Sequence, residues 1–579
     1  MRTKIRYVSI VGVAMATSAA LAGCGGGSSG GTAAVSSASS AKGGTLYYLY
    51  QKSVDHLDPQ RVYVGTDGAN IGRLWSRSLV QFPVTEDAAK ASTPVPDLAT
   101  TTGTSSDHAK TWKFTLKDGV KWQDGKPVTC ADVKYGVSRS FATDVITGGP
   151  NYILGYLDIP EVKSGKRKGL PVYDGPYKND GVKYFDKAVT CSGKTITYHF
   201  KKPWPDFNLA IAALRCFDPY RKDKDQGNKS NYVVFSDGPY KLQGSWTKGQ
   251  GGTFVRNPEY NAKTDGVRKA LPDKIVFEPG VTPEIAADRM IADSGKDKDA
   301  VTYLNIPPSK FSQINGAVAQ RAVNPQSPYV NYLVPNFKRL TNPKVREALM
   351  LATNKAAYIA AGGGSKTYDP AYSIVNPSVK GYVKNATFAA VPEKGDVAKA
   401  KKLLKEAGVK LPYPITFTYE GGTPTMDKQA AALKATWDKA GFKTRLNGLP
   451  DLYWSVIQNP DQKSDVMWAG WGADWPAIST VIPPLFDSRV NLTPGSTGQD
   501  YGSYQSDKVN KLIDKAAMMT SVDAAAKVYA QIDTQLAKDV AYIPLDVQKF
   551  YWLHGSNVTN YINNPATTMY PDLGSIGVK

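Results

Sequence analysis

"YPITFTYEGGTPTMDKQAAALKATWDKAGFKTRLNGL" spans Tyr413 to Leu449 and contains a strand, a helix and a second strand in that order. "YPITFTYE" alternates apolar and polar residues, as a half-buried strand does. "DKQAAALKATWDKAG" is rich in helix-forming residues and ends at Gly441, a residue typical of helix C-termini. "FKTRLNGL" again favours a strand. A strand, a helix and a strand of these lengths predict an α/β body with a mostly parallel sheet.

The segments on either side continue this pattern. "NPKVREALMLATNKAAYIAAGGG" has Asn342 as a helix N-cap, Pro343 in the first turn and glycines at its end. "DVAKAKKLLKEAG" is a helix that ends at Gly408. Two later helices are predicted in "SDKVNKLIDKAAMM" and "SVDAAAKVYAQIDTQLAKD". The strand-like "VAYIPLDVQKFYWLHG" follows them, which suggests that the chain returns to an earlier sheet.

The first half of the chain is richer in strands. In "TWKFTLKDGVKWQDGKPVTCADVKYGVSRSFA", Trp112, Phe114 and Leu116 alternate as in a half-buried strand, and "KDG" and "QDG" are turns. Thr129 is placed to cap a helix, because Asp132 follows three residues later. "KTITYHFKKP" repeats the strand alternation. We predict a sheet-rich subdomain that includes one helix.

The N-terminus has the features of an export signal. Arg2, Lys4 and Arg6 precede the apolar run "VSIVGVAMATSAALA", which is too short for a convincing membrane span. "LAGC", ending at Cys24, resembles a bacterial lipobox, which implies cleavage after residue 23 and lipidation of the cysteine. The alternative is an ordinary signal peptide with a chance cysteine. The Gly/Ser/Ala-rich stretch up to residue 44 predicts a flexible tether.

Composition and charge narrow the class of protein. The chain has 579 residues, 41% of them hydrophobic, so we expect a globular protein of two or three domains. Its net charge is +20, but the lysines are scattered and no basic run is long enough for a nucleic-acid patch. The charge is therefore interpreted as a solvated surface that an anionic cell envelope would attract, and we expect no nucleic-acid partner.

Cysteine and histidine usage argues against a metal site. Beyond Cys24, the three cysteines Cys130, Cys191 and Cys216 allow three disulfide pairings. We favour Cys130–Cys191, because both follow a Val-Thr pair beside strand-like segments. There is no Cys-x-x-Cys, and the four histidines are far apart in sequence. Neither a nucleophile elbow nor a phosphate or dinucleotide loop is present, so we expect no metal, no cofactor and no catalytic residues.

One cluster stands out, "VMWAGWGADWPAIST" from Val466 to Thr480. A carboxylate screened from water by indoles interacts more strongly with a cation, and small residues beside it let a ligand backbone approach. The candidate ligand-binding residues are Trp468, Gly470, Trp471, Gly472, Ala473, Asp474 and Trp475. The alternative is that the tryptophans fill a core and that Asp474 caps a helix starting in "PAISTVIPPLF".

Several segments resemble, in order, a known family. They are "LDPQRVY", "SLVQF", "WKFTLKDGVKWQDGKPVTCADVKYGVSR", "SDGPYKL", "NPKVREAL", "AKKLLKEAG" and "QAAALKATWDKAGF". This family is the extracytoplasmic solute-binding lipoproteins of ABC importers for peptides, dipeptides and nickel, known as family 5 and similar to oligopeptide-binding protein. The resemblance implies an α/β fold of two lobes joined by a hinge, with an extra sheet-rich subdomain. The implied parts are lobe I at 45–80, 231–305 and 540–579, the subdomain at 81–230 and lobe II at 306–539.

The resemblance also implies a function. A monomeric, lipid-anchored binding protein at the outer face of the cell membrane would capture peptides between its lobes and deliver them to a permease and ATPase complex, without catalysis. In peptide-binding members, an aspartate in a segment similar to "GWGADWP" receives the ligand's α-ammonium, a role carried here to Asp474. The family often has a second acidic residue shortly afterwards, and residues 476–478 have none. No lysine or arginine can be chosen as the partner of a ligand carboxylate.

Two other classes of function stay open at this stage. The ligand of a binding protein with these tryptophans could be a nickel chelate, a sugar or another cationic solute, because indoles stack on rings and surround cations. The chain could also be an exported hydrolase or a peptidoglycan-modifying enzyme, since paired catalytic carboxylates have no fixed spacing.

Overall fold

The computed structural model of the protein describes residues 42–149, 152–450, 452–492 and 497–579. The predicted export signal (1–23), Cys24 and all but the end of the predicted tether lie outside these residues. Within the described ranges, no helix combines the length and the apolar character that crossing a bilayer requires.

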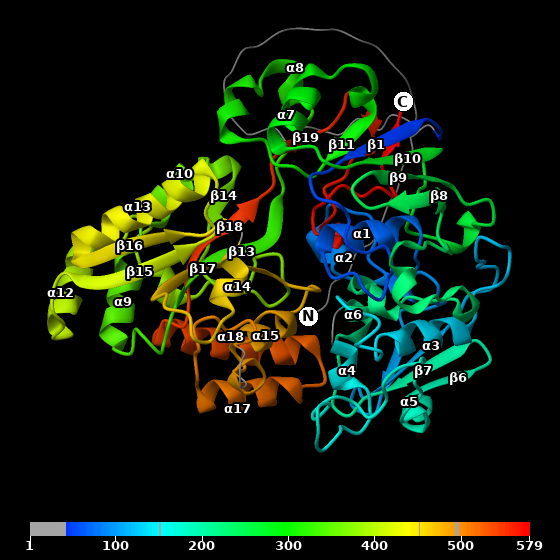
Figure 1. The fold of residues 1–579 in the computed structure, drawn as a ribbon, viewed down its shortest axis with the longest axis horizontal. Helices are drawn as coiled ribbons and strands as arrows, with labels where there is room; N and C mark the ends of the chain where they lie inside the picture. The colour runs from blue at the N-terminus through cyan, green and yellow to red at the C-terminus, as the bar shows by residue number, and fades with distance from the viewer. Residues whose placement is uncertain (1–41, 150–151, 451, 493–496) are drawn as a thin grey trace, which may run out of the picture. The chain divides into compact units, whose positions relative to one another are not determined.

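A mixed sheet of six strands forms the centre of the second half of the chain, which we call lobe II (Figure 1). In spatial order the strands are β14 (Tyr368–Pro370), β18 (Ile543–Lys549), β13 (Gln326–Pro335), β17 (Val466–Gly472), β15 (Tyr413–Tyr419) and β16 (Phe442–Gly448). Apolar side chains of the sheet and of the surrounding helices form one large core. The helices of this half are α9 (Pro343–Ala352), α10 (Lys355–Ala361), α11 (Ala386–Ala389), α12 (Val397–Glu406), α13 (Pro424–Ala440), α14 (Tyr453–Ile457), α15 (Ile482–Phe486), α16 (Ser488–Asn491), α17 (Asp507–Ala517) and α18 (Val522–Asp539).

The unit predicted from Tyr413 to Leu449 is confirmed. Thr423 caps α13 by accepting a hydrogen bond from the backbone N–H of Met426. The helix ends at Gly441, whose φ of 110° is a left-handed conformation that favours glycine. β15 and β16 are parallel and in register from end to end.

The prediction of a mostly parallel sheet is wrong for the other half of lobe II. β13 is antiparallel to both of its neighbours, β17 and β18, and β14 is antiparallel to β18. The reason is that the chain enters lobe II along β13 and leaves it along β18, side by side and in opposite directions. The expected single helix after Asn342 is also two helices, because the first ends at Ala352 and Asn354 caps the next by accepting from the N–H of Ala357.

A five-stranded sheet forms the centre of the body that we call lobe I. Its spatial order is β11 (Ala300–Thr302), β1 (Thr45–Leu49), β10 (Lys274–Glu278), β9 (Gly251–Arg256) and β8 (Tyr240–Thr247). The helices of this body are α1 (Gly65–Leu74), α2 (Ala88–Ala91), α7 (Pro283–Ala292) and α8 (Gly316–Ala319), and its short strand pair is β20 (Val558–Thr559) with β21 (Gly577–Val578). Residues from both ends of the described chain therefore share one core. A second short pair, β2 (Val80–Gln81) with β3 (Val95–Pro96), packs through Val80 into the core of the subdomain.

The sheet-rich subdomain packs around a separate core. Its four strands lie in the order β4 (Thr104–Ser106), β5 (Thr111–Thr115), β7 (Thr195–His199) and β6 (Val189–Ser192), and its helices are α3 (Cys130–Arg139), α4 (Tyr152–Tyr156), α5 (Val182–Ala188) and α6 (Phe207–Ala213). Thr129 and Asp132 form a capping box at the start of α3, as the sequence predicted. A disulfide joins Cys130 at the start of α3 to Cys191 in β6, the pairing favoured from the sequence, and Cys216 is a buried thiol.

A buried ion pair fixes the subdomain to lobe I. The guanidinium of Arg139, at the end of α3, donates to both oxygens of Asp58, at 2.7 and 2.6 Å. Neither side chain has any exposed surface, and Asp225 accepts a further bond from Arg139 at 3.0 Å. Removing one partner of such a pair would leave an uncompensated buried charge. Two of the segments that resemble the family, "LDPQRVY" and the one ending at Arg139, therefore meet to hold the fold together.

The chain passes between the lobes twice, and the two crossings are hydrogen-bonded to each other. β12 (Ala322–Val323) pairs with β19 (Trp552–Leu553), and Gln326 in β13 then pairs with Lys549 in β18. Between these pairs, the N–H of Phe550 donates to the carbonyl of Pro325 at 2.9 Å. These paired crossings lie near residues 325 and 550.

Opening the disulfide should weaken the subdomain. Replacing Cys130 and Cys191 by serine frees a loop with a sequence separation of 61 residues. Loop-closure entropy makes the expected loss about 4 kcal/mol in the free energy of unfolding. Urea unfolding followed by tryptophan fluorescence measures it, with Cys216→Ala as a control that leaves the disulfide intact. Identical unfolding midpoints for the double variant and the unmodified protein would contradict this prediction.

Candidate functional site

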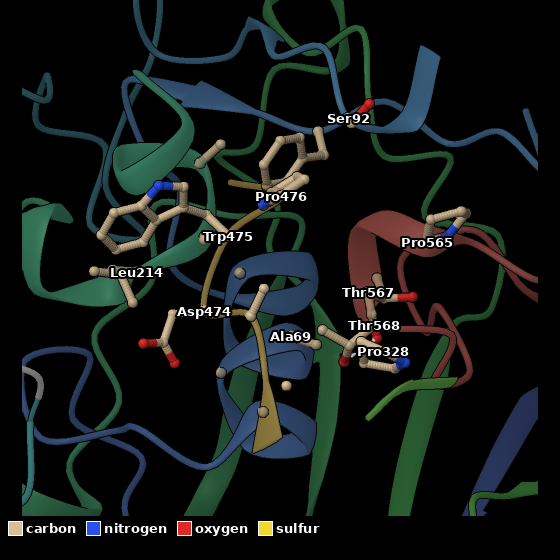
Figure 2. Close-up of a pocket in the computed structure, with 18 of the residues that line it drawn as sticks. Ala69, Ser92, Leu214, Pro328, Asp474, Trp475, Pro476, Pro565, Thr567 and Thr568 are labelled. Carbon is tan, nitrogen blue, oxygen red and sulfur yellow. Dashed lines mark hydrogen bonds between the residues drawn. The ribbon is translucent and has the colours of Figure 1, made fainter. Parts of the chain in front are cut away.

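A cavity of about 340 Å³ is lined by residues of lobe I, the subdomain and lobe II. Lobe I contributes residues 62–65, 68–69 and 72–73 with Pro565, Thr567 and Thr568, and the subdomain contributes residues 212–215. Residues 81–82 and 91–92 also line the cavity, and lobe II contributes residues 328–329, 378–379 and 470–476. Figure 2 shows Asp474, Trp475 and Leu214 on one side of the helix that carries Ala69, with Thr567 and Thr568 on the other side. The predicted segment "GWGADWP" thus lies at the cavity along its whole length.

One wall of the cavity is a helical face without large side chains. Gly65, Gly68, Ala69 and Gly72 of α1 all line the cavity. Their spacing of three and four residues places them on a single face of the helix. A Cβ atom added at Gly68 would have no other atom within 4 Å, which leaves room for a ligand close to the helix backbone, whereas the guanidinium of Arg215 occupies the space beside Gly72.

Another wall is the end of β17, where one strand edge is unpaired. β17 pairs with β13 from Val466 to Gly472, but with β15 only at Val466 and Met467. Within the described residues, the second edge of Gly470 to Gly472 therefore has no neighbouring strand. Its backbone N–H and C=O groups are available to an extended ligand.

The two glycines of β17 are also required by their neighbours in β13. A Cβ atom at Gly470 would lie 2.9 Å from Oδ1 of Asn331, and one at Gly472 would lie 2.8 Å from the ring of Tyr329. The sequence suggested that these glycines admit a ligand backbone. The structure adds a packing reason, because the side chains of β13 already occupy that space.

Asp474 follows β17 and is half-buried at the cavity. Its Oδ2 accepts hydrogen bonds from the hydroxyls of Tyr63, at 2.9 Å, and Tyr152. Its backbone N–H donates to the hydroxyl of Thr480 at 3.1 Å. The alternative role of helix cap is not observed, since the helical segments that follow begin at Ile478 and Ile482 without a side-chain cap.

Electrostatics make Asp474 a site for positive charge. Burial raises the pKa of its carboxyl to about 6, and the hydrogen bonds from Tyr152 and Tyr63 partly oppose this shift. No Lys or Arg of the described residues forms an ion pair with it. A carboxylate that has lost part of its hydration without gaining a cation is stabilised by a ligand that brings one.

Trp475 points away from lobe II into the core of the subdomain. Only 3% of its surface is exposed, and its ring lies against Tyr152 and Trp204, with centroid distances of 4.8 and 6.2 Å. Its indole N–H donates to Oδ2 of the buried Asp206 at 2.7 Å, and the hydroxyl of Ser479 donates to the same oxygen. Although Trp475 lines the cavity, its main contacts hold lobe II to the subdomain.

The other two tryptophans differ from each other. Trp471 lines the cavity and donates its indole N–H to the carbonyl of Thr480 at 2.9 Å. Trp468 was expected to line the site and is not part of the lining; its indole donates to the hydroxyl of Tyr358 at 3.1 Å. The cause is the two-residue period of the strand, which turns residues 468 and 471 to opposite faces of the sheet.

Tyr63 and Tyr152 are site residues that the sequence did not indicate. Tyr63 ends the segment "LDPQRVY", and Tyr152 begins α4. No pattern of spacing connects either residue to Asp474.

In the described part of the chain, no group of three or more His, Cys, Asp or Glu side chains is arranged to hold a metal ion.

Known proteins provide an independent comparison. Residues 93–492 match the bacterial extracellular solute-binding proteins, family 5, in the middle region of that family. The chain belongs to this family. It is 25% identical over 466 residues to the periplasmic oligopeptide-binding protein OppA of Salmonella typhimurium, covering 78% of each chain, and 26% identical over 475 residues to the glutathione-binding protein GsiB of Salmonella paratyphi A, covering 80% of this chain and 83% of that one.

Solved structures of this family share the fold. Clavulanic acid biosynthesis oligopeptide binding protein 2 superposes with a TM-score of 0.83 and 25% sequence identity, over 93% of this chain and 96% of that chain. The expected two-lobed α/β fold and the resemblance to family 5 are both confirmed. The relatives are solute-binding proteins, so the comparison favours the class of binding proteins over that of exported hydrolases.

Trp475 should contribute more to stability than a tryptophan at the surface. Trp475→Ala removes a buried ring and leaves Asp206 with Ser479 as its remaining side-chain donor, which should cost about 3–5 kcal/mol of unfolding free energy. Trp454 is 38% exposed, and Trp454→Ala is the matched control. Urea unfolding monitored by circular dichroism compares the two variants. Equal losses of stability would show that Trp475 does not anchor the two bodies.

Proposed function

We propose that this protein captures peptides between its two lobes and delivers them to the permease and ATPase complex of an ABC importer. A lipid on Cys24 and the tether that follows would hold it at the outer face of the cell membrane. The ligands are oligopeptides or dipeptides with a free amino terminus. The single observation that carries this proposal is the carboxylate of Asp474, which faces the cavity without a cationic partner among the described residues.

The geometry around Asp474 suits an extended peptide. The α-ammonium would bind the carboxylate, and the free edge of β17 from Gly470 to Gly472 would pair with the peptide backbone as an added strand. Main-chain pairing of this kind is independent of the peptide's side chains. The arrangement therefore supports binding of many sequences through one fixed end.

The size of the cavity and the names of the relatives support the same class of ligand. A volume of about 340 Å³ lies at the lower end of the range for small-molecule sites, which favours short peptides. The relatives described above are named for binding oligopeptides and glutathione, a short peptide. A nickel chelate or a sugar has no peptide backbone to pair with the strand edge of Gly470 to Gly472.

The ligand class is tested by native mass spectrometry of the protein purified without denaturation, followed by calorimetry with dialanine, trialanine and pentaalanine. We expect a retained mass that fragments as a peptide, and binding of at least one of the three peptides. A retained nickel chelate or sugar, with no binding of any peptide, would contradict the proposal.

Asp474→Asn should weaken peptide binding without unfolding the protein. Asparagine keeps the shape of the side chain and an oxygen for the tyrosine hydroxyls, but it removes the charge that pairs with the ammonium. Loss of a partly buried charge pair costs about 2–4 kcal/mol, which corresponds to a roughly 30- to 1000-fold weaker affinity. Calorimetry with trialanine measures it, and Asp118→Asn, at a side chain that is 87% exposed, is the isosteric control. Unchanged affinity in Asp474→Asn would refute the site.

Peptide affinity should fall in acid. The ammonium binds the ionised carboxylate, so binding lowers a pKa that is about 6 in the free protein. Affinity is then greatest near pH 7 and falls by about tenfold for each pH unit below 6, and it falls again above about pH 8 because the peptide's α-amino group loses its proton there. Burial and the charge of Asp474 raise the pKa values of Tyr63 and Tyr152, so neither hydroxyl titrates in this range. Calorimetry from pH 5 to 8 checks this. The affinity of Asp474→Asn should not fall between pH 7 and pH 5, because asparagine has no carboxyl to protonate.

A further inference from the structure

The two carboxylate oxygens of Asp474 differ in their hydrogen-bond partners. The hydroxyls of Tyr63 and Tyr152 both donate to Oδ2. Within the described part of the chain, no donor contacts Oδ1. Oδ1 is therefore the oxygen that remains for a ligand in the cavity.

This asymmetry bears on which cation fits. Each oxygen of a carboxylate has about two acceptor positions, so two hydroxyl donors fill those of Oδ2. A guanidinium binds a carboxylate through two parallel hydrogen bonds, one to each oxygen. An ammonium is a compact charge that forms a charge-assisted hydrogen bond to a single oxygen. Because two hydroxyls already donate to Oδ2, a guanidinium cannot readily form its second hydrogen bond there. An ammonium needs only Oδ1, so its binding is unaffected.

We propose that Tyr63 and Tyr152 are specificity-determining residues that select a primary ammonium over a guanidinium at Asp474. This inference rests on the proposed function, since it names the group of the peptide that this end of the cavity accepts. The amino terminus of a peptide then occupies the site, and an arginine side chain is rejected from it.

The positions of the two tyrosines are set by lobe I and the subdomain rather than by Asp474 alone. Tyr63 lies just before α1, whose small residues form the cavity wall. Tyr152 is the first residue of α4, and its ring packs edge-on against Trp475 at 4.8 Å. Because burial and the charge of Asp474 raise the pKa of each hydroxyl, both keep their protons and act as donors at neutral pH. Neither becomes a phenolate, so neither adds a second negative charge that would attract a guanidinium.

The test uses three forms of one probe, trialanine: the free peptide, the peptide with its amino terminus converted to a guanidine, and the N-acetylated peptide. Calorimetry at pH 7.5 measures binding of each to the full mature protein. We expect the unmodified protein to bind free trialanine about tenfold or more tightly than the guanidinylated form, because two hydroxyl donors already occupy Oδ2, the oxygen that the second parallel hydrogen bond of the guanidinium would need. The acetylated form, which has no charge, should bind most weakly.

Phenylalanine variants isolate the role of the hydroxyls. Tyr63→Phe, Tyr152→Phe and the double variant free acceptor positions on Oδ2, so the preference for free over guanidinylated trialanine should fall about tenfold or more. Tyr156→Phe, one turn along α4 and without the hydrogen bond to Asp474 that Tyr152 makes, is the matched control and should keep the full preference. The added bulk of the guanidine is the same in every variant, so a change in the ratio reports hydrogen bonding and not size.

The outcomes separate this inference from the proposed function. Equal binding of both charged probes by the unmodified protein, or an unchanged ratio in the variants, would overturn the selection and leave peptide binding intact. Failure of free trialanine and of every other free peptide to bind would overturn both. Thermal unfolding checks that each variant is folded. If Tyr152→Phe does not fold, Tyr63→Phe is sufficient for the test, because Tyr63 is 45% exposed and its hydroxyl can be removed without disturbing a core.

Discussion

The insertion of Trp475 into the subdomain is the contact on which the site depends. This residue leaves the sheet of lobe II and buries its ring in the core of another body, where its N–H binds the buried Asp206. Burial of a large aromatic ring supplies the driving force, and the hydrogen bond fixes the direction of the ring. The neighbouring Asp474 is thereby held opposite Tyr63 and Tyr152. Trp475, which anchors lobe II to the subdomain, thus positions Asp474, the residue proposed to bind the ligand.

The sequence predicted which residues between Val466 and Thr480 line the cavity better than it predicted what each of them contacts. Its composition indicated a carboxylate beside indoles and small residues, and six of the seven candidates line the cavity. The three tryptophans make different contacts, since Trp471 bonds to a nearby loop, Trp475 anchors the two bodies and Trp468 faces Tyr358. The partners of Asp474 could not be predicted, because Tyr63 and Tyr152 are 411 and 322 residues away along the chain.

Local patterns predicted the elements of the fold, and topology accounts for what was missed. The strand, helix and strand from Tyr413 to Leu449 form as expected, because turn residues, a cap and a terminal glycine act within a few residues. The antiparallel half of the same sheet depends on where the chain enters and leaves lobe II, which no short segment records. The resemblance to family 5 supplied that information only coarsely, and the boundaries it implies at residues 306 and 540 stay predictions.

The paired crossings near Pro325 and Phe550 also govern how the lobes can move. Two separate linkers would permit sliding as well as rotation, whereas these segments are bonded to each other and continue as paired strands on both sides. A two-stranded ribbon resists shear along its length and yields to twisting and to bending across its plane. The opening and closing that the proposed function requires would then be largely a rotation about the ribbon. The cavity walls would separate and return along one path, so the carboxylate and the tyrosines would meet again in the same alignment after each release of ligand.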